Sequence, residues 1–249
     1  MTYSSLLACA AAVLALPALA ADGPKQSFQE THTERLDIPP GGTVHIDNSY
    51  GYLTVEGWDQ PRVEVTVTKT TDRYYAPSHQ QKEEQRFAEI RVVADRPKRD
   101  DVAITTSLPP RKGGVNSVIP FDRMIVIRSL LPRNHRGVTV DCRVRVPRDA
   151  RLIVRHDYGY VWVSDVSGDL EIDSHTGDMI VMLPEPGPYA IDARTRLGSI
   201  SSDFAGNGHK QLLIGTHFTY PGPESHQVRL RMGRGNITLK EGGPPNPIE

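Results

Sequence analysis

The sequence has little cysteine, few aromatic residues and almost no net charge. It contains two cysteines, and aromatic residues make up 6% of its 249 residues. With 29 Lys and Arg against 30 Asp and Glu, its formal net charge is −1. Such a balance excludes the bulk positive charge that draws proteins onto nucleic acid or anionic membranes. We therefore expect no nucleic-acid partner.

The long hydrophobic run of the chain is at its N-terminus. Residues 4–20, SSLLACAAAVLALPALA, contain the helix breaker Pro17 and end in small residues. The run is short for a membrane span and is followed by polar residues, which is typical of a secretory signal peptide, although no Lys or Arg precedes it. We predict a signal peptide over 1–21 and a periplasmic or extracellular mature protein without stable membrane insertion.

Removal of the signal peptide removes Cys9, and Cys142 is then the one cysteine left, so an intrachain disulfide is excluded. Cys142 alternates with Val140 and Val144, which predicts a thiol that points into the core. A reactive thiol needs an electropositive and partly exposed site. We therefore expect an inert, buried cysteine.

A pattern of apolar residues around glycine occurs twice in succession, in LIVRHDYGYVWVSDV and in LEIDSHTGDMIVML. Counted from Gly159 and Gly177, apolar residues stand seven and five positions before the glycine and two and four positions after it. The same spacing fits Gly51, Gly198 and Gly235, and of the twenty positions only Ser202 is polar. The pattern therefore predicts that each copy forms one short strand before the glycine and one after it, with the glycine as a hinge.

The step from five before the glycine to two after it is odd, so simple alternation would turn the second apolar set outward. A bend at the glycine restores both sets to the inside, and glycine permits the positive φ or close backbone approach that such a bend needs. Gly159 and Gly177 lie 18 residues apart, and Gly177 and Gly198 lie 21 residues apart, which is the length of one solenoid rung.

We therefore predict an all-β chain whose domain at 22–249 is a single-stranded β-solenoid of stacked rungs. An irregular insertion of about 74–137 contains strands at 90–94 and 102–104 and a loop over LPPRKGGVNSVIP. We expect a further strand at 212–214 and a disordered tail of about 241–249, where proline cannot donate to a ladder.

The stretch VRVPRDARLIVRHDYGYVWVSDVSGDLEIDSHTGDMIVMLPEPGPYAIDARTRLGSI, with HIDNSYGYLTVEGWD before it, resembles the bacterial putative-adhesin family. The resemblance is carried by the Val146-Pro147 turn and the hinge glycines, and it extends from about Val44 to Leu239. It implies an exported, non-catalytic β-solenoid domain of otherwise unknown function; the adhesin label is itself an inference for the family.

The candidate binding residues stand one and three positions after the hinge, where side chains should face outward. These are Tyr52, Tyr160 and Trp162. If the first two rungs stack, the three form an exposed aromatic patch that suits a sugar ring or a partner's apolar anchor. The alternative is that they cover a strand face or the loop from Tyr74. We expect a glycan or an envelope protein as partner.

Four positions before the hinge the chain places charged residues, namely Asp47, Arg155, Asp173, Arg194 and Arg231. In consecutive rungs Arg155, Asp173 and Arg194 would lie one above another. Opposite charges on neighbouring strands support register modestly, so we interpret them as a structural ladder.

Aspartates are frequent in the repeats but lack the nine-residue glycine-rich repeat of calcium-filled β-rolls. They are Asp157, Asp165, Asp169, Asp173 and Asp178. His156 and His175 stand at different offsets from the hinge, which argues against a shared metal. We expect no metal and no cofactor.

An enzyme would need converging carboxylates on one face. Asp169 and Glu171 flank the inward Leu170, with no matching acid at the same offset in both neighbouring rungs. We therefore predict a non-catalytic, adhesin-like binding module of the cell envelope. The alternatives are a structural envelope scaffold and a polysaccharide-active β-helix enzyme.

Overall fold

The computed structural model describes residues 24–107, 116–121, 124–129, 138–184, 189–211, 215–222 and 226–242. For residues 107, 116–121, 124–129, 210 and 211 only the backbone is described. The expected signal peptide, the expected strand at 212–214 and residues 243–249 of the expected tail lie outside the described residues.

The described residues form β-strands and one short α-helix, which confirms the prediction of an all-β chain. The strands are β1 (Gln29–Asp37), β2 (Thr43–Asn48), β3 (Gly51–Trp58), β4 (Arg62–Thr71), β5 (Arg91–Lys98), β6 (Asp101–Ser107), β7 (Asn116–Phe121), β8 (Met124–Ser129), β9 (Val138–Pro147), β10 (Arg151–Ser164), β11 (Leu170–Thr176), β12 (Met179–Leu183), β13 (Tyr189–Leu197), β14 (Ile200–Ser202), β15 (Asn207–Gln211), β16 (Gly215–Tyr220), β17 (His226–Arg234) and β18 (Ile237–Glu241). A 3₁₀ turn, η1 (Pro77–His79), leads into helix α1 (Gln80–Glu89). No helix in the described part of the chain is long and apolar enough to span a membrane.

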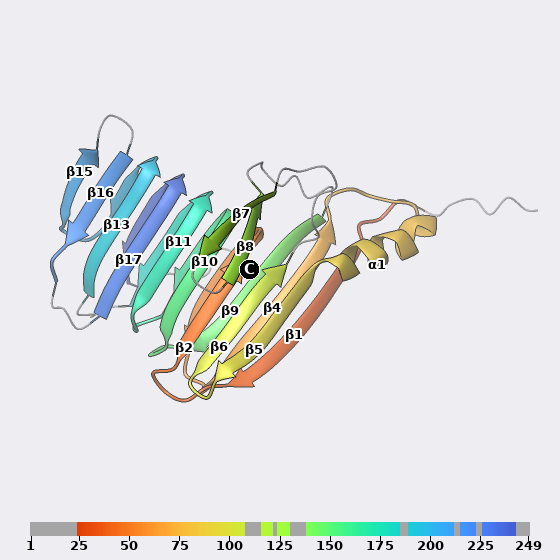
Figure 1. Ribbon diagram of the computed structural model, residues 1–249, viewed down its shortest axis with the longest axis horizontal. Helices are drawn as coiled ribbons and strands as arrows, with labels where there is room; N and C mark the ends of the chain where they lie inside the picture. The colour runs from red at the N-terminus through yellow and green to blue at the C-terminus, as the bar shows by residue number, and fades with distance from the viewer. Residues whose placement is uncertain are drawn as a thin grey trace, which may run out of the picture.

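Strand pairing divides the sheet into two layers. Layer 1 has the order β5-β6-β2-β10-β11-β17-β13-β16-β15. Layer 2 has the order β1-β4-β9-β3-β10-β12-β18-β14. Strand β10 contributes its first half to layer 1 and its second half to layer 2. Figure 1 shows the strands side by side from β15 at one end to β1 at the other, with α1 at the β1 end.

A glycine stands at the hinge of each of the five repeated units, where the described chain passes from a strand of layer 1 directly into a strand of layer 2. The φ angles of these glycines are all positive: 101° at Gly51, 132° at Gly159, 135° at Gly177, 146° at Gly198 and 133° at Gly235. A Cβ built on Gly177 would lie 1.6 Å from the carbonyl oxygen of Gly159, and one on Gly235 would lie 1.5 Å from that of Gly177. Neighbouring units therefore approach so closely at the hinge that no side chain fits there.

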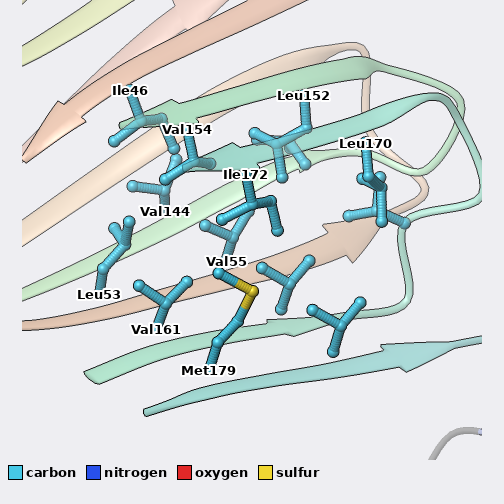
Figure 2. Close-up of a cluster of buried hydrophobic side chains, with 14 of the residues drawn as sticks. Ile46, Leu53, Val55, Val144, Leu152, Val154, Val161, Leu170, Ile172 and Met179 are labelled. Atoms are coloured by element: carbon cyan, nitrogen blue, oxygen red, sulfur yellow. The ribbon is translucent and has the colours of Figure 1, made fainter. Parts of the chain in front are cut away.

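The apolar positions of the repeat form the core between the two layers. All of them are buried except Ile200 and Ser202, which are half-buried on the edge strand β14. Figure 2 shows side chains of the two layers, among them Ile172 and Val161, pointing toward one another. Cys142 joins this core, as its sequence pattern predicts, and burial beside Asp141 raises the pKa of the thiol to about 12.

The order of the units corrects the expected charge ladder. Asp173 is opposite Arg231, and Arg231 in turn is opposite Arg194. The prediction that Arg155, Asp173 and Arg194 lie on consecutive units is therefore correct for Arg155 and Asp173 but wrong for Asp173 and Arg194, because Arg231 lies between them. Strand β17 lies between β11 and β13, while β16 pairs with the other edge of β13. Every unit has the same apolar offsets, so the sequence period cannot distinguish these stacking orders.

The sheet is mixed, not uniformly parallel. The five hinged units pair in parallel, but β1, β4 and β9 are antiparallel at one end and β13, β16 and β15 at the other. Within the expected insertion, the strands predicted at 90–94 and 102–104 are present as β5 and β6 and extend layer 1. The loop predicted over LPPRKGGVNSVIP is wrong at its end, where Asn116–Phe121 pairs with β8.

The face assignment predicts different costs for two adjacent alanine substitutions. Ile172→Ala removes a fully buried side chain and should lower the free energy of unfolding by roughly 2 to 5 kcal/mol. Asp173→Ala acts on an exposed residue and should cost less than about 1 kcal/mol. Urea denaturation of both variants measures the difference, and equal losses would show that the two faces are assigned wrongly.

Candidate functional site

The two units that contain β3 and β10 carry tyrosines on both sides of their hinge glycines. Tyr50 and Tyr158 precede the hinge, whereas Tyr52 and Tyr160 follow it. Because β3 and β10 pair in parallel with Tyr52 opposite Tyr160, equivalent tyrosines of the two units lie next to each other. We call these four residues the hinge ridge.

The tyrosines of the hinge ridge form two stacked pairs. The ring centroids of Tyr52 and Tyr160 are 5.4 Å apart with an interplanar angle of 6°, and those of Tyr50 and Tyr158 are 5.9 Å apart at 12°. Tyr52 is 50% exposed and Tyr160 is 51% exposed. Tyr52 and Tyr160 therefore stack on each other while about half of each side chain stays accessible to solvent.

Of the three candidate binding residues, the structure brings Tyr52 and Tyr160 together on the outer face. Trp162 lies on the same outer face as Tyr160, two residues further along β10, but it is half-buried between the neighbouring strands. The sequence argument missed Tyr50 and Tyr158. A tyrosine directly before the hinge in both units is the signal that could have identified them.

Tyr50 is the least exposed tyrosine of the ridge, and its hydroxyl is held in the neutral form. Partial burial raises its pKa, and the nearby Asp72 carboxylate, Tyr158 and Tyr52 act in the same direction. A phenol that stays protonated can donate a hydrogen bond as well as accept one.

In the three remaining units the position after the hinge is polar. Asn236 donates from its backbone N–H (2.9 Å) and from Nδ2 (3.1 Å) to Oδ1 of Asp178. Ser199 donates from its backbone N–H (3.1 Å) and from Oγ (2.8 Å) to Oδ1 of Asn236. These hydrogen bonds link neighbouring units at the hinge, so the polar groups of Asp178, Asn236 and Ser199 already have partners within the protein.

The carboxylates considered for catalysis do not converge. Oδ1 of Asp169 accepts a hydrogen bond from the backbone of Gln227 (2.9 Å), and Glu171 lies on the outer face opposite Arg229. Wherever side chains are described, no three His, Cys, Asp or Glu residues are close enough together to hold a metal ion. His156 points inward and is buried, whereas His175 is exposed on the outer face.

A column of polar side chains lines the inside of the hinge corner. Thr106, Asn48, His156 and Ser174 are register partners on β6, β2, β10 and β11, and all four are buried. The Asn48 amide lies 3.2 Å from Nδ1 of His156, while Nε2 of His156 and the hydroxyls of Thr106 and Ser174 have no hydrogen-bond partner within the described residues. Burial lowers the pKa of His156 to about 4. The nearby backbone polar groups of Asn48 and Gly159 raise the pKa, but they offset only part of the effect of burial.

No protein-family model matches the chain, and no curated protein matches it. Two solved structures are similar in shape. A putative cell adhesion protein from Clostridium sporogenes is 13% identical, with a TM-score of 0.42 over 85% of this chain and 100% of that one. A putative adhesin from Bacteroides fragilis is 8% identical, with a TM-score of 0.25 over 84% of this chain and 97% of that one.

The buried His156 predicts a specific loss of stability in mild acid. Its pKa is depressed on folding, so the unfolded chain binds a proton first as the pH falls below about 6.5, the ordinary histidine value. The free energy of unfolding should decline from that pH down to about 4, where the loss reaches roughly 3 kcal/mol. Denaturation between pH 7 and pH 4 measures this decline. His156→Gln should remove this part of the decline, and an unchanged pH profile in that variant would contradict the assignment.

Proposed function

We propose that this chain is an exported, non-catalytic binding module whose five hinged units form a short β-solenoid. Its hinge ridge contacts a glycan or an envelope protein. The observation that carries the proposal is the Tyr52–Tyr160 pair, which stacks across two units while each ring remains half exposed. Large aromatic side chains that are ordered without being buried are typical of recognition surfaces.

The solenoid part of the proposal rests on repetition. The parallel register places equivalent residues of neighbouring units opposite each other, as with Gly51 and Gly159 or Met179 and Ile237. Each hinge glycine has positive φ, and all except Gly51, which faces Val140 on β9, face the carbonyl oxygen of the hinge glycine in the adjacent unit. Stacked units of this kind bury their apolar faces against one another, which is the principle of a solenoid.

The ridge has two properties that favour binding. Mutual stacking fixes the ring orientations of Tyr52 and Tyr160 before a ligand arrives, which reduces the side-chain entropy that binding costs. The outer ring faces offer apolar area for the C–H groups of a sugar or for an apolar side chain, and the hydroxyls offer hydrogen bonds. The alternative that these rings cover a strand face or the loop from Tyr74 has little support, because Tyr52 and Tyr160 themselves are 50% and 51% exposed.

The proposal predicts that the double variant Tyr52→Ala/Tyr160→Ala loses binding but remains folded. Affinity for a glycan identified on an array, or for an envelope protein captured by the parent, should fall at least about tenfold, or about 1.4 kcal/mol. The melting temperature should change little because both rings are half exposed. Isothermal titration calorimetry and thermal denaturation give the two readouts.

Tyr74→Ala is the matched control, since it removes an exposed tyrosine outside the ridge. It should bind like the parent. If the double variant binds as tightly as the parent, or if the control loses affinity equally, the ridge is not the binding surface. A parent that binds no glycan and no envelope protein would leave the scaffold interpretation in its place.

A further inference from the structure

A row of basic side chains crosses the outer face of layer 1 near its β15 end. The register places Arg231 on β17 opposite Arg194 on β13, Arg194 opposite His217 on β16, and His217 opposite His209 on β15. We call these four residues the basic row. Arg231 and Arg194 each lie between two buried residues, and His217 precedes the buried Phe218, so these three side chains face outward. His209 is the register partner of His217 and therefore lies on the same face.

The row is accessible over its whole length. The side chain of Arg194 is 48% exposed, that of Arg231 is 28% exposed and that of His217 is 20% exposed, while His209 is also exposed. Neighbouring strands are about 4.8 Å apart, so four strands carry a basic group at regular intervals over roughly 14 Å. This spacing presents a line of donors instead of a single pocket.

One carboxylate orders the row. Asp192 accepts hydrogen bonds from Arg231 (2.7 Å), His217 (2.9 Å) and Arg194 (3.2 and 3.3 Å). Partial burial alone would raise the pKa of Asp192, but the hydrogen bond and charge of Arg231, with His217 and Arg194, hold it below its ordinary value. Asp192 thus stays ionised and fixes the three side chains before any ligand arrives. Guanidinium groups have five N–H donors, so both arginines retain donors for a second acceptor.

Two further arginines flank the row. Arg229 on β17 and Arg196 on β13 are exposed, and neither forms an ion pair or a side-chain hydrogen bond with a described residue. Arg229 and Arg231 on β17 and Arg194 and Arg196 on β13 therefore surround Asp192 on the outer face of layer 1. A chain with a net charge of −1 concentrates positive charge at this place.

We propose that the basic row, with Arg229 and Arg196 beside it, binds an acidic polysaccharide that lies across the strands. Guanidinium groups bind carboxylate and sulfate oxygens in pairs, and successive arginines on adjacent strands can each take one anionic group of the chain. This surface is separate from the hinge ridge, so the inference goes beyond the function proposed above and does not depend on it.

The surroundings of the row favour a polysaccharide over other polyanions. Strand β11 places Glu171 opposite Arg229 and Asp173 opposite Arg231, so the positive surface ends at β17 and is narrow for the two phosphate backbones of a nucleic-acid duplex. The outward residues next to the arginines include the polar Gln227 on β17 and Thr219 on β16. None of the exposed large apolar side chains of the described residues lies on these strands, so this face has no such group to insert into a lipid surface. The narrow and polar basic row therefore fits a single flexible polysaccharide chain.

Binding of the whole protein to polygalacturonate, heparin and neutral dextran tests the proposal at low and at moderate salt. We expect binding to at least one of the two acidic polysaccharides, a decrease with added salt, and no binding to dextran. Polygalacturonate and heparin distinguish carboxylate from sulfate recognition. The variant Arg194→Gln/Arg229→Gln should bind at least about tenfold more weakly.

The control is Arg151→Gln/Arg155→Gln, which removes the same charge from exposed positions on β10 of the same layer. It should bind like the parent, and the melting temperatures of both variants should stay close to that of the parent. Equal weakening in the two double variants would show bulk attraction and overturn the proposal. The proposal also fails if the parent binds neither acidic polysaccharide, or if it binds duplex DNA or anionic vesicles more tightly than both.

Discussion

The contact on which this structure depends is the approach of each hinge glycine to a carbonyl oxygen of the neighbouring unit. At Gly159, Gly177, Gly198 and Gly235 a Cβ would lie within 2.0 Å of the carbonyl oxygen of the adjacent hinge glycine, and at Gly51 it would meet Val140 instead. The positive φ at each glycine turns the chain from one layer to the other. Because the glycines align, every residue at a given distance from the hinge meets its equivalent in the next unit.

This alignment explains both surfaces and the buried column with one rule. Residues directly beside the hinge face outward, which gives the stacked tyrosines in two units and the Asp178–Asn236 contact in two others. Residues that stand three positions before the hinge glycine point inward, which places Asn48 beside His156 inside the hinge corner. Arg231 and Arg194 stand four positions before the hinge, on the outer face of layer 1, where both donate hydrogen bonds to Asp192. The hinge ridge, the outer arginines and the core are therefore consequences of the same register.

Much of this could be predicted from the sequence, because alternation around glycine determines which side chains face inward, as Ile172 and Leu239 show. The order of the units could not, since the offsets of the Gly235 and Gly198 units are identical. The basic row depends on that order and on the antiparallel β16, so no local pattern indicates that Arg231, Arg194 and His217 meet. Pairing across such long sequence separations is decided by packing.

The most direct test of the hinge account is the stability of three glycine variants. In Gly177→Ala the new methyl group would meet the Gly159 carbonyl oxygen and positive φ would be strained. Gly41 has positive φ of 69° but open space, and Gly208 has open space and no positive φ. By urea denaturation, Gly208→Ala should cost almost nothing, Gly41→Ala about 1–2 kcal/mol, and Gly177→Ala clearly more than about 2 kcal/mol. A Gly177→Ala protein as stable as the Gly41→Ala protein would show that close approach at the hinge does not hold the units together.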